Sequence, residues 1–303
     1  MPQAPVAIFV GGTSGIGRGM AEAFAHHMNG NARIIIIGRN QAAATEIIRS
    51  FPKPTKRTEP NTDSSPSDNP EAIHEFISAD FSSISDVHET AKVLLDRLQR
   101  VDYLVLTQGV LLFAGRKETK EGLDEKMALS YYSRWTITRD LLPLLRKSEN
   151  HGGARVYSVL SAGRGDLGSM DVDDLDLKKH YTIEKCRLAV STYNDLSMQK
   201  FAKEDPQISF SHAYPGLVRS AMITSSRWWL TTAYYLFYPF FVYFSQTPEA
   251  AGKIHISACM ASPPGFNSYG EMGESLKYTP ADEEMVEYVW KHTLEVTESL
   301  KTE

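Results

Sequence analysis

Two residues in the middle of the chain have side chains and a spacing suited to acid–base chemistry. Tyr181 and Lys185 are four residues apart, which places both on one face if the segment is helical. A phenol has a pKa of about 10 and is a poor acid at neutral pH, but a nearby ammonium stabilises the phenolate and lowers that pKa. The pair could then protonate a carbonyl oxygen that is being reduced. The spacing alone carries little weight, because it occurs by chance in long chains.

A serine upstream of this pair strengthens the interpretation. Ser161 follows a β-forming run at 155–160, and open α/β sheets bind their ligands at the carboxyl ends of strands. Its hydroxyl could hold the substrate oxygen beside Tyr181, although a turn or cap role is the alternative. Ser158, the nearest other serine, lies within the run, so we expect it to be buried.

The N-terminal segment has the pattern of an element that brings a cofactor to such groups. Val6–Val10 predicts a buried strand, Gly11, Gly15 and Gly17 follow as G-x-x-x-G-x-G, and an apolar-periodic helix begins straight after. Such glycines let the backbone approach a pyrophosphate, and the helix N-terminus favours its charge. The alternative is a tight turn without a ligand. The loop residues that would share the phosphate contact are Thr13, Ser14 and Ile16.

The second strand ends on a residue that indicates which dinucleotide binds. At this position an acidic side chain would bind the 2′-hydroxyl of the adenosine ribose, but the chain has Arg39. A guanidinium suits a 2′-phosphate, so NADP(H) is expected rather than NAD. The alternative is a solvated arginine at a strand end.

Runs of β-forming residues alternate with helical patterns six times, which predicts one parallel sheet covered by helices on both faces. We therefore predict an α/β, Rossmann-type doubly wound fold in a single domain over 1–303. A helix is expected from Tyr181 to about Ala202, and residues 51–70, rich in Pro, Ser, Asp and Asn, indicate a mobile surface insertion. The predicted strands are Val6–Val10, 34–37, 75–79, 103–107, 155–160 and 208–213, and a long helical pattern covers 123–145.

Composition excludes several other classes of protein. The 303 residues are 42% hydrophobic and 23% charged, with a net charge of −5 and no basic block, so a nucleic-acid partner is not expected. The two cysteines, Cys186 and Cys259, have no ligand spacing, and the acidic stretch at 171–176 is expected to be a solvated loop, so no metal site is predicted. The composition and the absence of a secretory signal pattern favour a reducing, cytoplasmic location. Core or surface roles are expected for the scattered histidines His151, His180 and His212.

Taken in order, these motifs resemble those of the short-chain dehydrogenase/reductase family over about residues 6–258. The interval from Ser161 to Tyr181 is long for the family, because 164–180 is extended. In this the chain is similar to the retinol-dehydrogenase-like and carbonyl-reductase-like branches, which favours a hydrophobic carbonyl substrate. The residues that carry the resemblance are Gly11, Gly15, Gly17, Asp80, Gly109, Ser161, Tyr181, Lys185, Pro215 and Gly216.

The resemblance implies a role for each matching position. Ser161 is then the catalytic serine, Tyr181 the proton donor, and Lys185 the residue that binds the nicotinamide ribose and lowers the Tyr181 pKa. Ser130 stands where the family often has an asparagine that holds a relay water, and the hydroxyl could hold it with a different geometry. The family also often pairs through its two long helices, which leaves a homodimer open. The remaining implied cofactor contacts are Asp80 at the adenine with Phe81 after it, Gly109, Pro215-Gly216 beside the nicotinamide, and Val218 with Ser220 at the carboxamide.

An aromatic run at 228–244 follows the last of these motifs. A membrane span is the least favoured of three interpretations, because the run is shorter than the roughly 20 apolar residues that a span needs and contains Pro239. Docking on a membrane surface or on a partner is a second reading, because Trp and Tyr favour interfaces. We favour a third, in which 217–246 is a lid over an apolar substrate pocket. Helices are expected from Thr247-Pro248-Glu249 to about Met260, and over 282–300.

The sequence thus predicts an NADPH-dependent ketoreductase, an oxidoreductase that reduces the ketone or aldehyde of a hydrophobic small molecule or oxidises the matching alcohol. Two alternatives stay open. One is an NADP-binding protein without turnover, and the other is a protein that docks on a membrane or a partner through 228–244.

Overall fold

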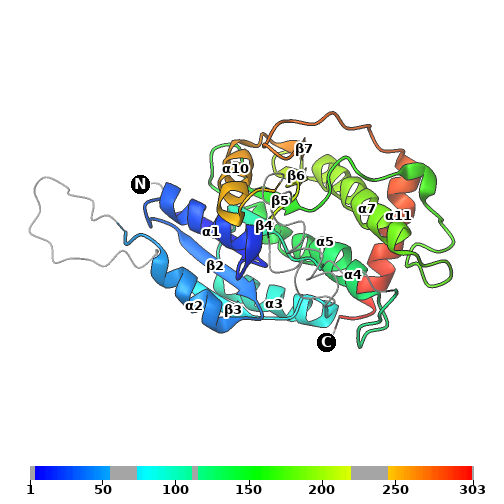
Figure 1. Cartoon of the computed structure of the whole chain (residues 1–303), viewed down its shortest axis with the longest axis horizontal. Coiled ribbons are helices and arrows are strands. Elements are labelled where there is room, and N and C mark those ends of the chain that lie inside the picture. Colours follow the sequence, from blue (N-terminus) through cyan, green and yellow to red (C-terminus); the bar gives the residue numbers. More distant parts are fainter. Residues whose placement is uncertain (1–3, 55–73, 111–114, 220–244, 302–303) are drawn as a thin grey trace, which may run out of the picture.

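Seven parallel strands form one sheet in the order β3-β2-β1-β4-β5-β6-β7 (Figure 1). The computed structural model describes residues 4–54, 74–110, 115–219 and 245–301. The strand order reverses between β1 and β4, and open α/β sheets bind ligands at the carboxyl ends of strands at such a point. The strands are β1 (Val6–Val10), β2 (Arg33–Gly38), β3 (Glu75–Ser78), β4 (Tyr103–Leu106), β5 (Arg155–Val159), β6 (Ser209–Ala213) and β7 (Gly265–Tyr269).

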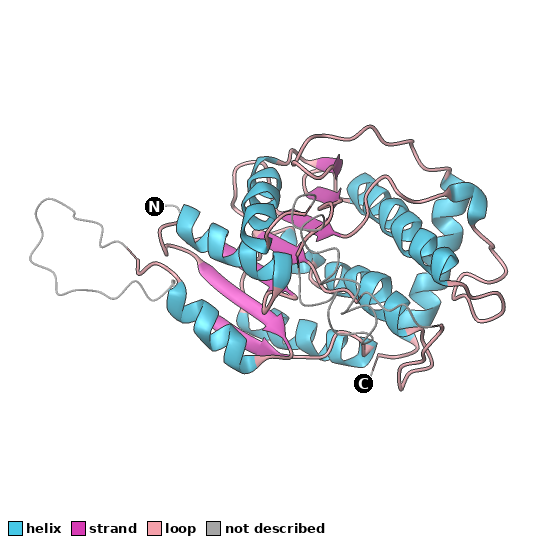
Figure 2. Ribbon diagram, viewed as in Figure 1, coloured by secondary structure: helices cyan, strands magenta, loops and turns pink. Residues whose placement is uncertain are grey.

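Helices cover both faces of the sheet, each over its own hydrophobic core (Figure 2). One face packs against α1 (Gly15–His27), α2 (Gln41–Ser50) and α10 (Pro248–Ala261). The other face packs against α3 (Ile84–Arg97), α5 (Ser133–Asp140), α7 (Ile183–Glu204) and α11 (Glu283–Glu298). Because both faces are covered, β1, β2 and β4 are continuous apolar runs, such as the four isoleucines of β2. The predicted α/β doubly wound fold is confirmed.

The glycine at position 19 lets α1 and α10 touch backbone to backbone. A Cβ on Gly19 would lie 2.2 Å from the Pro248 carbonyl oxygen, and one on Gly252 would lie 2.3 Å from the Gly19 carbonyl carbon. A side chain in either place would push the helices apart. Thr247 caps α10 by accepting from Ala250 N at 3.1 Å, as its sequence predicts.

All six predicted strands are present, with ends that differ by at most one residue. The prediction missed the seventh strand, β7, which pairs with β6 at the sheet edge. Its sequence, GFNSY, contains glycine and asparagine and no β-branched residue, so β-propensity gives no signal there. The C-terminal helix is confirmed as α11, with Val289, Thr293 and Thr297 on its buried side.

The long helix predicted over 123–145 is interrupted. It consists of α4 (Glu125–Met127), a π-helical segment (Ala128–Tyr132), α5 and α6 (Leu142–Leu145). Pro143 lies within the first turn of α6, where a missing N–H does no harm, so the break falls before it at Leu141. π-helical segments are often found at functional sites, and this one contains Ser130.

The predicted insertion at 51–70 and the aromatic run at 228–244 lie mostly or wholly outside the described residues. None of the helices within the described ranges is both long enough and apolar enough to cross a membrane.

Candidate active site

The loop between β1 and α1 has the backbone shape of a phosphate cradle. Gly11 and Gly15 have φ angles of 79° and 54°, a region that residues with a Cβ rarely adopt. A Cβ on Gly17 would lie 2.5 Å from the Gly11 carbonyl oxygen, so helix and loop are in close contact. Ser14 is the N-cap residue of α1, yet its side chain makes no capping hydrogen bond. Its hydroxyl and the first N–H groups of α1, which have no helical acceptor, can therefore bind an anion.

The side chain of Arg39 extends from the end of β2 next to this loop. A Cβ on the preceding Gly38 would lie 3.0 Å from Thr13 Cγ2, so the strand end adjoins the loop. The Arg39 side chain is 73% exposed, and its Nη1 lies 3.9 Å from Asp80 Oδ2 at the end of β3. Since an exposed ion pair of this kind is weak, Arg39 can turn toward a bound phosphate at little cost.

Phe81, predicted at the cofactor site after Asp80, turns its side chain into the core. Its ring is 4% exposed and belongs to the hydrophobic core beneath α3, because the chain turns inward after Asp80 to start that helix. Only the backbone of Phe81 is left to face a cofactor.

After β4 the chain continues through Thr107, which bonds to β1, to Gly109, which has no side chain. Thr107 Oγ1 donates to the Val10 carbonyl at 2.9 Å and ties β4 to β1 below the glycine loop. A Cβ on Gly109 would have Ser130 Oγ at 3.8 Å and Arg134 Nη2 at 3.9 Å as its nearest neighbours. Gly109 therefore lies beside Ser130, although the two are far apart in the sequence.

The backbone of Ser161 is held on both sides. Its N–H donates to His212 Nε2 at 3.2 Å, and its carbonyl accepts from Ser191 Oγ at 2.5 Å. Ser158 is fully buried within β5, as expected. The prediction gave His212 only a core or surface role. It is in the core, but its contact with Ser161 was missed, since 51 positions separate them.

Tyr181 does not share a helical face with Lys185, contrary to the prediction. Thr182 caps α7 by accepting from Lys185 N at 3.0 Å, so the helix begins at Ile183 and Tyr181 precedes it. Tyr181 Oη is buried and has no hydrogen-bond partner among the described residues. The Lys185 side chain is exposed.

The electrostatics of Tyr181 also differ from the expectation. Burial, together with the neighbouring Cys186 and Asp124, raises the pKa of Tyr181 well above its usual value, whereas Arg116 lowers it. The ammonium that does lie over the ring is that of Lys126, 5.2 Å from the ring centroid. The predicted lowering of the pKa by Lys185 is therefore wrong for the chain without ligands, because Lys185 is exposed on α7.

Ser130 is buried within the π-helical segment. Its carbonyl accepts from Asn194 Nδ2 at 3.0 Å, and the same amide also donates to the Val190 carbonyl at 2.7 Å. An amide of α7 thus bonds to the backbone of the segment where the family often has its asparagine side chain.

A buried arginine that the prediction missed joins the ends of β4 and β5. Arg134 is 1% exposed and donates to Ser158 Oγ at 2.6 Å, to the Val159 carbonyl at 3.0 Å and to the Gln108 carbonyl at 2.5 Å. Burial lowers its pKa to about 9. The sequence signal for this arginine was its charge within the helical pattern predicted over 123–145. A charged side chain that is buried needs hydrogen-bond partners.

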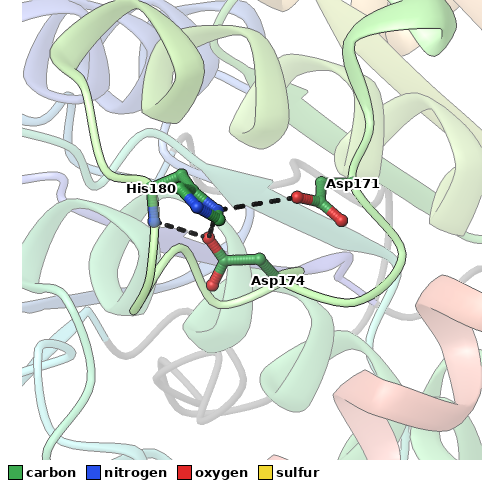
Figure 3. A group of neighbouring side chains, drawn as sticks. All are labelled: Asp171, Asp174 and His180. Atoms are coloured by element: carbon green, nitrogen blue, oxygen red, sulfur yellow. Dashed lines mark hydrogen bonds and ion pairs between the residues drawn. The ribbon is translucent and has the colours of Figure 1, made fainter.

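Three side chains close the turn that leads into Tyr181 (Figure 3). His180 Nδ1 lies 3.6 Å from Asp174 Oδ2 and 3.8 Å from Asp171 Oδ2. The three side-chain atoms that could bind a metal ion all lie within 4.8 Å of one another. The solvated loop expected here is wrong for Asp174, which is 3% exposed. Its carboxylate accepts from Lys179 N and His180 N, which lowers its pKa. These bonds fix the backbone just before the tyrosine.

The turn after β6 closes the site on the other side. Gly216 has a φ of 68°, and a Cβ there would lie 2.1 Å from the Glu271 carboxyl carbon. Pro215 and Val218 are buried, and Val218 forms a parallel bridge with Gln246. The other predicted carboxamide contact, Ser220, and most of the predicted lid at 217–246 lie outside the described residues.

Comparison with known proteins decides the family. Residues 5–165 match the model of the family described as short chain dehydrogenase. The chain belongs to the short-chain dehydrogenase family. It is 35% identical to oxidoreductase AN1596 of Emericella nidulans over 82% of this chain and 70% of that protein, and 31% identical to oxidoreductase andH of Emericella variicolor over 86% and 71%. Membership makes the chain an oxidoreductase by family.

More distant relatives agree on the fold. Polyprenol dehydrogenase of Mus musculus is 28% identical over 75% of this chain and 64% of that protein. The RhlG/NADP active-site complex of Pseudomonas aeruginosa superposes with a TM-score of 0.57 at 19% identity, covering 89% of this chain and 96% of that one. A short-chain dehydrogenase/reductase of Brucella melitensis gives 0.59 at 14% identity, over 90% and 97%.

Proposed function

We propose that the protein is an NADP(H)-dependent oxidoreductase that reduces a ketone or aldehyde on a hydrophobic small molecule. The observation that carries the proposal is the glycine loop: two left-handed glycines lead into a helix whose N-cap serine makes no capping hydrogen bond. Such a loop binds the pyrophosphate of a dinucleotide. The sheet edge beside it holds Ser161, and Tyr181 precedes the helix that binds the Ser161 backbone.

The residues around the loop fit a nicotinamide dinucleotide with a 2′-phosphate. Arg39 is exposed at the strand end where the adenosine ribose would lie, and Asp80 stands at the next strand end. RhlG of Pseudomonas aeruginosa, whose fold this chain shares, was solved with NADP. A bound dihydronicotinamide would supply the hydride.

The protein's own part of the reaction is to place an oxygen and deliver a proton. Ser161 would hold the substrate oxygen by a hydrogen bond, and Tyr181 would donate its phenolic proton as that oxygen becomes an alkoxide. Burial raises the pKa of Tyr181 in the chain without ligands, which makes the phenol a weaker acid. The transfer would therefore rely on the strongly basic alkoxide that forms beside it. Lys185 would bind the ribose from the first turn of α7.

The chemical class of the substrate follows from weaker support. The chain resembles the retinol-dehydrogenase-like and carbonyl-reductase-like branches, and the mouse relative's name gives a polyprenol, an apolar alcohol, as its substrate. A hydrophobic carbonyl compound is therefore the first class to test.

The resemblance also left a homodimer open. In this chain α11 packs on α5 and α7. The ring centroid of Trp290 lies 5.1 Å from that of Trp135 and 4.9 Å from that of Phe201. Pairing of two copies through α5 and α7 would therefore require α11 to move.

A second candidate is an NADP-binding protein without turnover. It is favoured by the exposed position of Lys185 and by the raised pKa of Tyr181. A catalytically silent protein would bind NADPH as tightly as an enzyme but would turn over no carbonyl compound.

Calorimetric titration with NADPH and with NADH tests the cofactor assignment. We expect NADPH to bind more tightly, and Arg39→Ala to weaken NADPH by about 10- to 100-fold, the value of a charge-assisted contact, while NADH changes little. The matched control is Arg49→Ala, an exposed arginine on α2, which should leave both affinities unchanged. Equal affinities in the wild type would remove the Arg39 argument, and no binding of either cofactor would contradict the enzyme proposal.

A further inference from the structure

A histidine and an aspartate lie directly behind Ser161, and the proposed reaction does not use them. His212 on β6 is fully buried. Its Nε2 is 3.2 Å from the Ser161 backbone nitrogen, and its Nδ1 is 2.6 Å from Asp195 Oδ1 on α7. The Asp195 side chain is 23% exposed. A side chain on one helix is thus linked through a buried ring to the backbone of the serine at the end of β5.

The hydrogen-bond roles fix the protonation state of the ring. A backbone N–H can only donate, so Nε2 of His212 must accept and carries no hydrogen. The imidazole is therefore neutral with its proton on Nδ1, from which it donates to the Asp195 carboxylate. Both partners favour this tautomer. The other one would place two donors face to face at the Ser161 N–H and two acceptors face to face at the Asp195 carboxylate.

The same helix holds the other side of Ser161. Ser191 Oγ donates to the Ser161 carbonyl at 2.5 Å, and Ser191 lies one turn before Asp195 on α7. Both peptide groups of Ser161 are thus bonded, one directly to α7 and the other to α7 through His212. These two contacts leave the Ser161 backbone little freedom to rotate.

We propose that Asp195 and His212 are positioning residues, which fix the backbone of Ser161 so that its hydroxyl points at the reacting oxygen. The proposal rests on the proposed function, because it takes Ser161 as the group that holds that oxygen. Hydrogen-bond catalysis is sensitive to such placement, since a displacement of about 1 Å can reduce the rate about 100-fold. A purely structural histidine would support the fold but would leave the reaction unaffected.

The first test needs no substrate. In ¹⁵N NMR spectra of the full chain we expect the His212 ring to be neutral, with its hydrogen on Nδ1, and a coupling or shift that links Nε2 to the Ser161 amide. His212→Gln offers an acceptor oxygen near the Nε2 position and should keep the Ser161 amide resonance close to its wild-type value, whereas His212→Leu should move it. A hydrogen on Nε2, or a Ser161 amide that is the same in all three proteins, would overturn the proposal.

The second test separates positioning from stability by kinetics. With a carbonyl substrate and NADPH we expect His212→Leu to lower kcat by about 10- to 100-fold, His212→Gln to recover part of it, and the Kd for NADPH to stay within about twofold in both. Asp195→Leu should also lower kcat. The matched control is His255→Leu, which removes another fully buried histidine, bonded to Tyr157 at 2.9 Å, and should lower stability without lowering kcat.

The outcomes are distinguishable from failure of the proposed function. A folded His212→Leu variant with wild-type kcat would overturn the positioning role while leaving the reductase intact. A wild type that turns over no carbonyl compound would contradict the proposed function, and the NMR result would then decide the Ser161 contact alone. If His212→Leu does not fold, His212→Gln and the wild-type tautomer still decide.

Discussion

The carboxyl edges of β1 and β5 lie at the same end of the sheet but are held by different means. At β1 the glycines at 11, 15 and 17 shape the site, and the groups offered to a ligand are mainly backbone N–H groups and the Ser14 hydroxyl. At β5 the position of Ser161 depends on side chains of α7 and β6. Substitutions at the β1 end should therefore impair ligand binding by steric overlap. Substitutions at the β5 end should impair the proposed reaction by removing single hydrogen bonds.

The largest effect is expected on the catalytic side. Tyr181→Phe removes the proton donor and should lower kcat by about 10²- to 10⁴-fold, while the Kd for NADPH changes little. Stopped-flow or steady-state assays beside calorimetry measure both. Tyr193→Phe is the matched control, because it removes a phenol on α7 itself, which donates to the Leu175 carbonyl at 3.2 Å. Turnover that survives Tyr181→Phe would show that another group donates the proton.

Gly17→Ala should produce the reverse pattern on the phosphate side. The new Cβ would lie 2.3 Å from Thr107 Oγ1 and 2.5 Å from the Gly11 carbonyl oxygen, so the loop must move. We expect NADPH binding to weaken by about 10- to 100-fold and the free energy of unfolding to fall by about 1–3 kcal/mol. Gly115→Ala is the control, since its Cβ would meet no atom within 4 Å. Unchanged binding in Gly17→Ala would mean that the loop does not hold the cofactor.

The two faces of the sheet should also respond differently to acid. On the α1–α10 face, burial lowers the pKa of His255 to about 4, so the unfolded chain takes up this proton first as the pH falls. The stability that the neutral ring contributes is complete above about pH 6.5 and is lost toward pH 4, by up to about 3 kcal/mol. On the other face, the hydrogen bond and charge of Asp140 outweigh burial and raise the pKa of His88, so its contribution is present in acid and is lost as the pH rises through that raised pKa.

Urea unfolding of the wild type and of His255→Gln between pH 4 and 7 measures the contribution of His255 to the free energy of unfolding. The variant should show a shallower loss of stability in acid than the wild type. His151→Gln, at an exposed histidine, is the control and should follow the wild-type curve. Parallel curves for the wild type and His255→Gln would contradict the assignment.

The smallest effect is expected for Lys185. In the protein without cofactor, Lys185→Met should leave the pKa of Tyr181 unchanged, because an exposed charge is screened by solvent, whereas Asp124→Asn should lower it by removing a nearby negative charge. The phenol resonances in ¹³C NMR spectra report both. A rise of the Tyr181 pKa in Lys185→Met would restore the pairing that the four-residue spacing predicted.

The sequence predicted what short-range patterns determine. Four consecutive isoleucines in β2, the G-x-x-x-G-x-G loop and the Thr247-Pro248 helix start are local signals, and each has its expected structure. The local backbone structure around the glycine loop was therefore predictable.

The catalytic side depends on contacts that no local pattern contains. His212 is 51 residues from Ser161 and 17 from Asp195, and Arg134 donates to the Leu106 carbonyl on β4 and the Val159 carbonyl on β5. The helix start was misplaced by two residues because Thr182 is the better cap, and this shift removed Tyr181 from the face of Lys185. A polar residue inside a predicted strand, such as His212, is the signal to examine, because its burial requires partners.

The contact between Gly19 and Gly252 has a consequence for motion. At the Gly19–Gly252 crossing the two helices touch through their backbones, and neither glycine has a side chain that could rearrange, so we expect α1 and α10 to open and close as one cooperative unit. The amide hydrogens of both helices should then exchange with solvent at a common rate, and a ligand that orders the N-terminus of α1 should slow exchange in α10. Through this contact, local fluctuations at the start of α10 would reach the glycine loop, although most of the chain separates them in sequence.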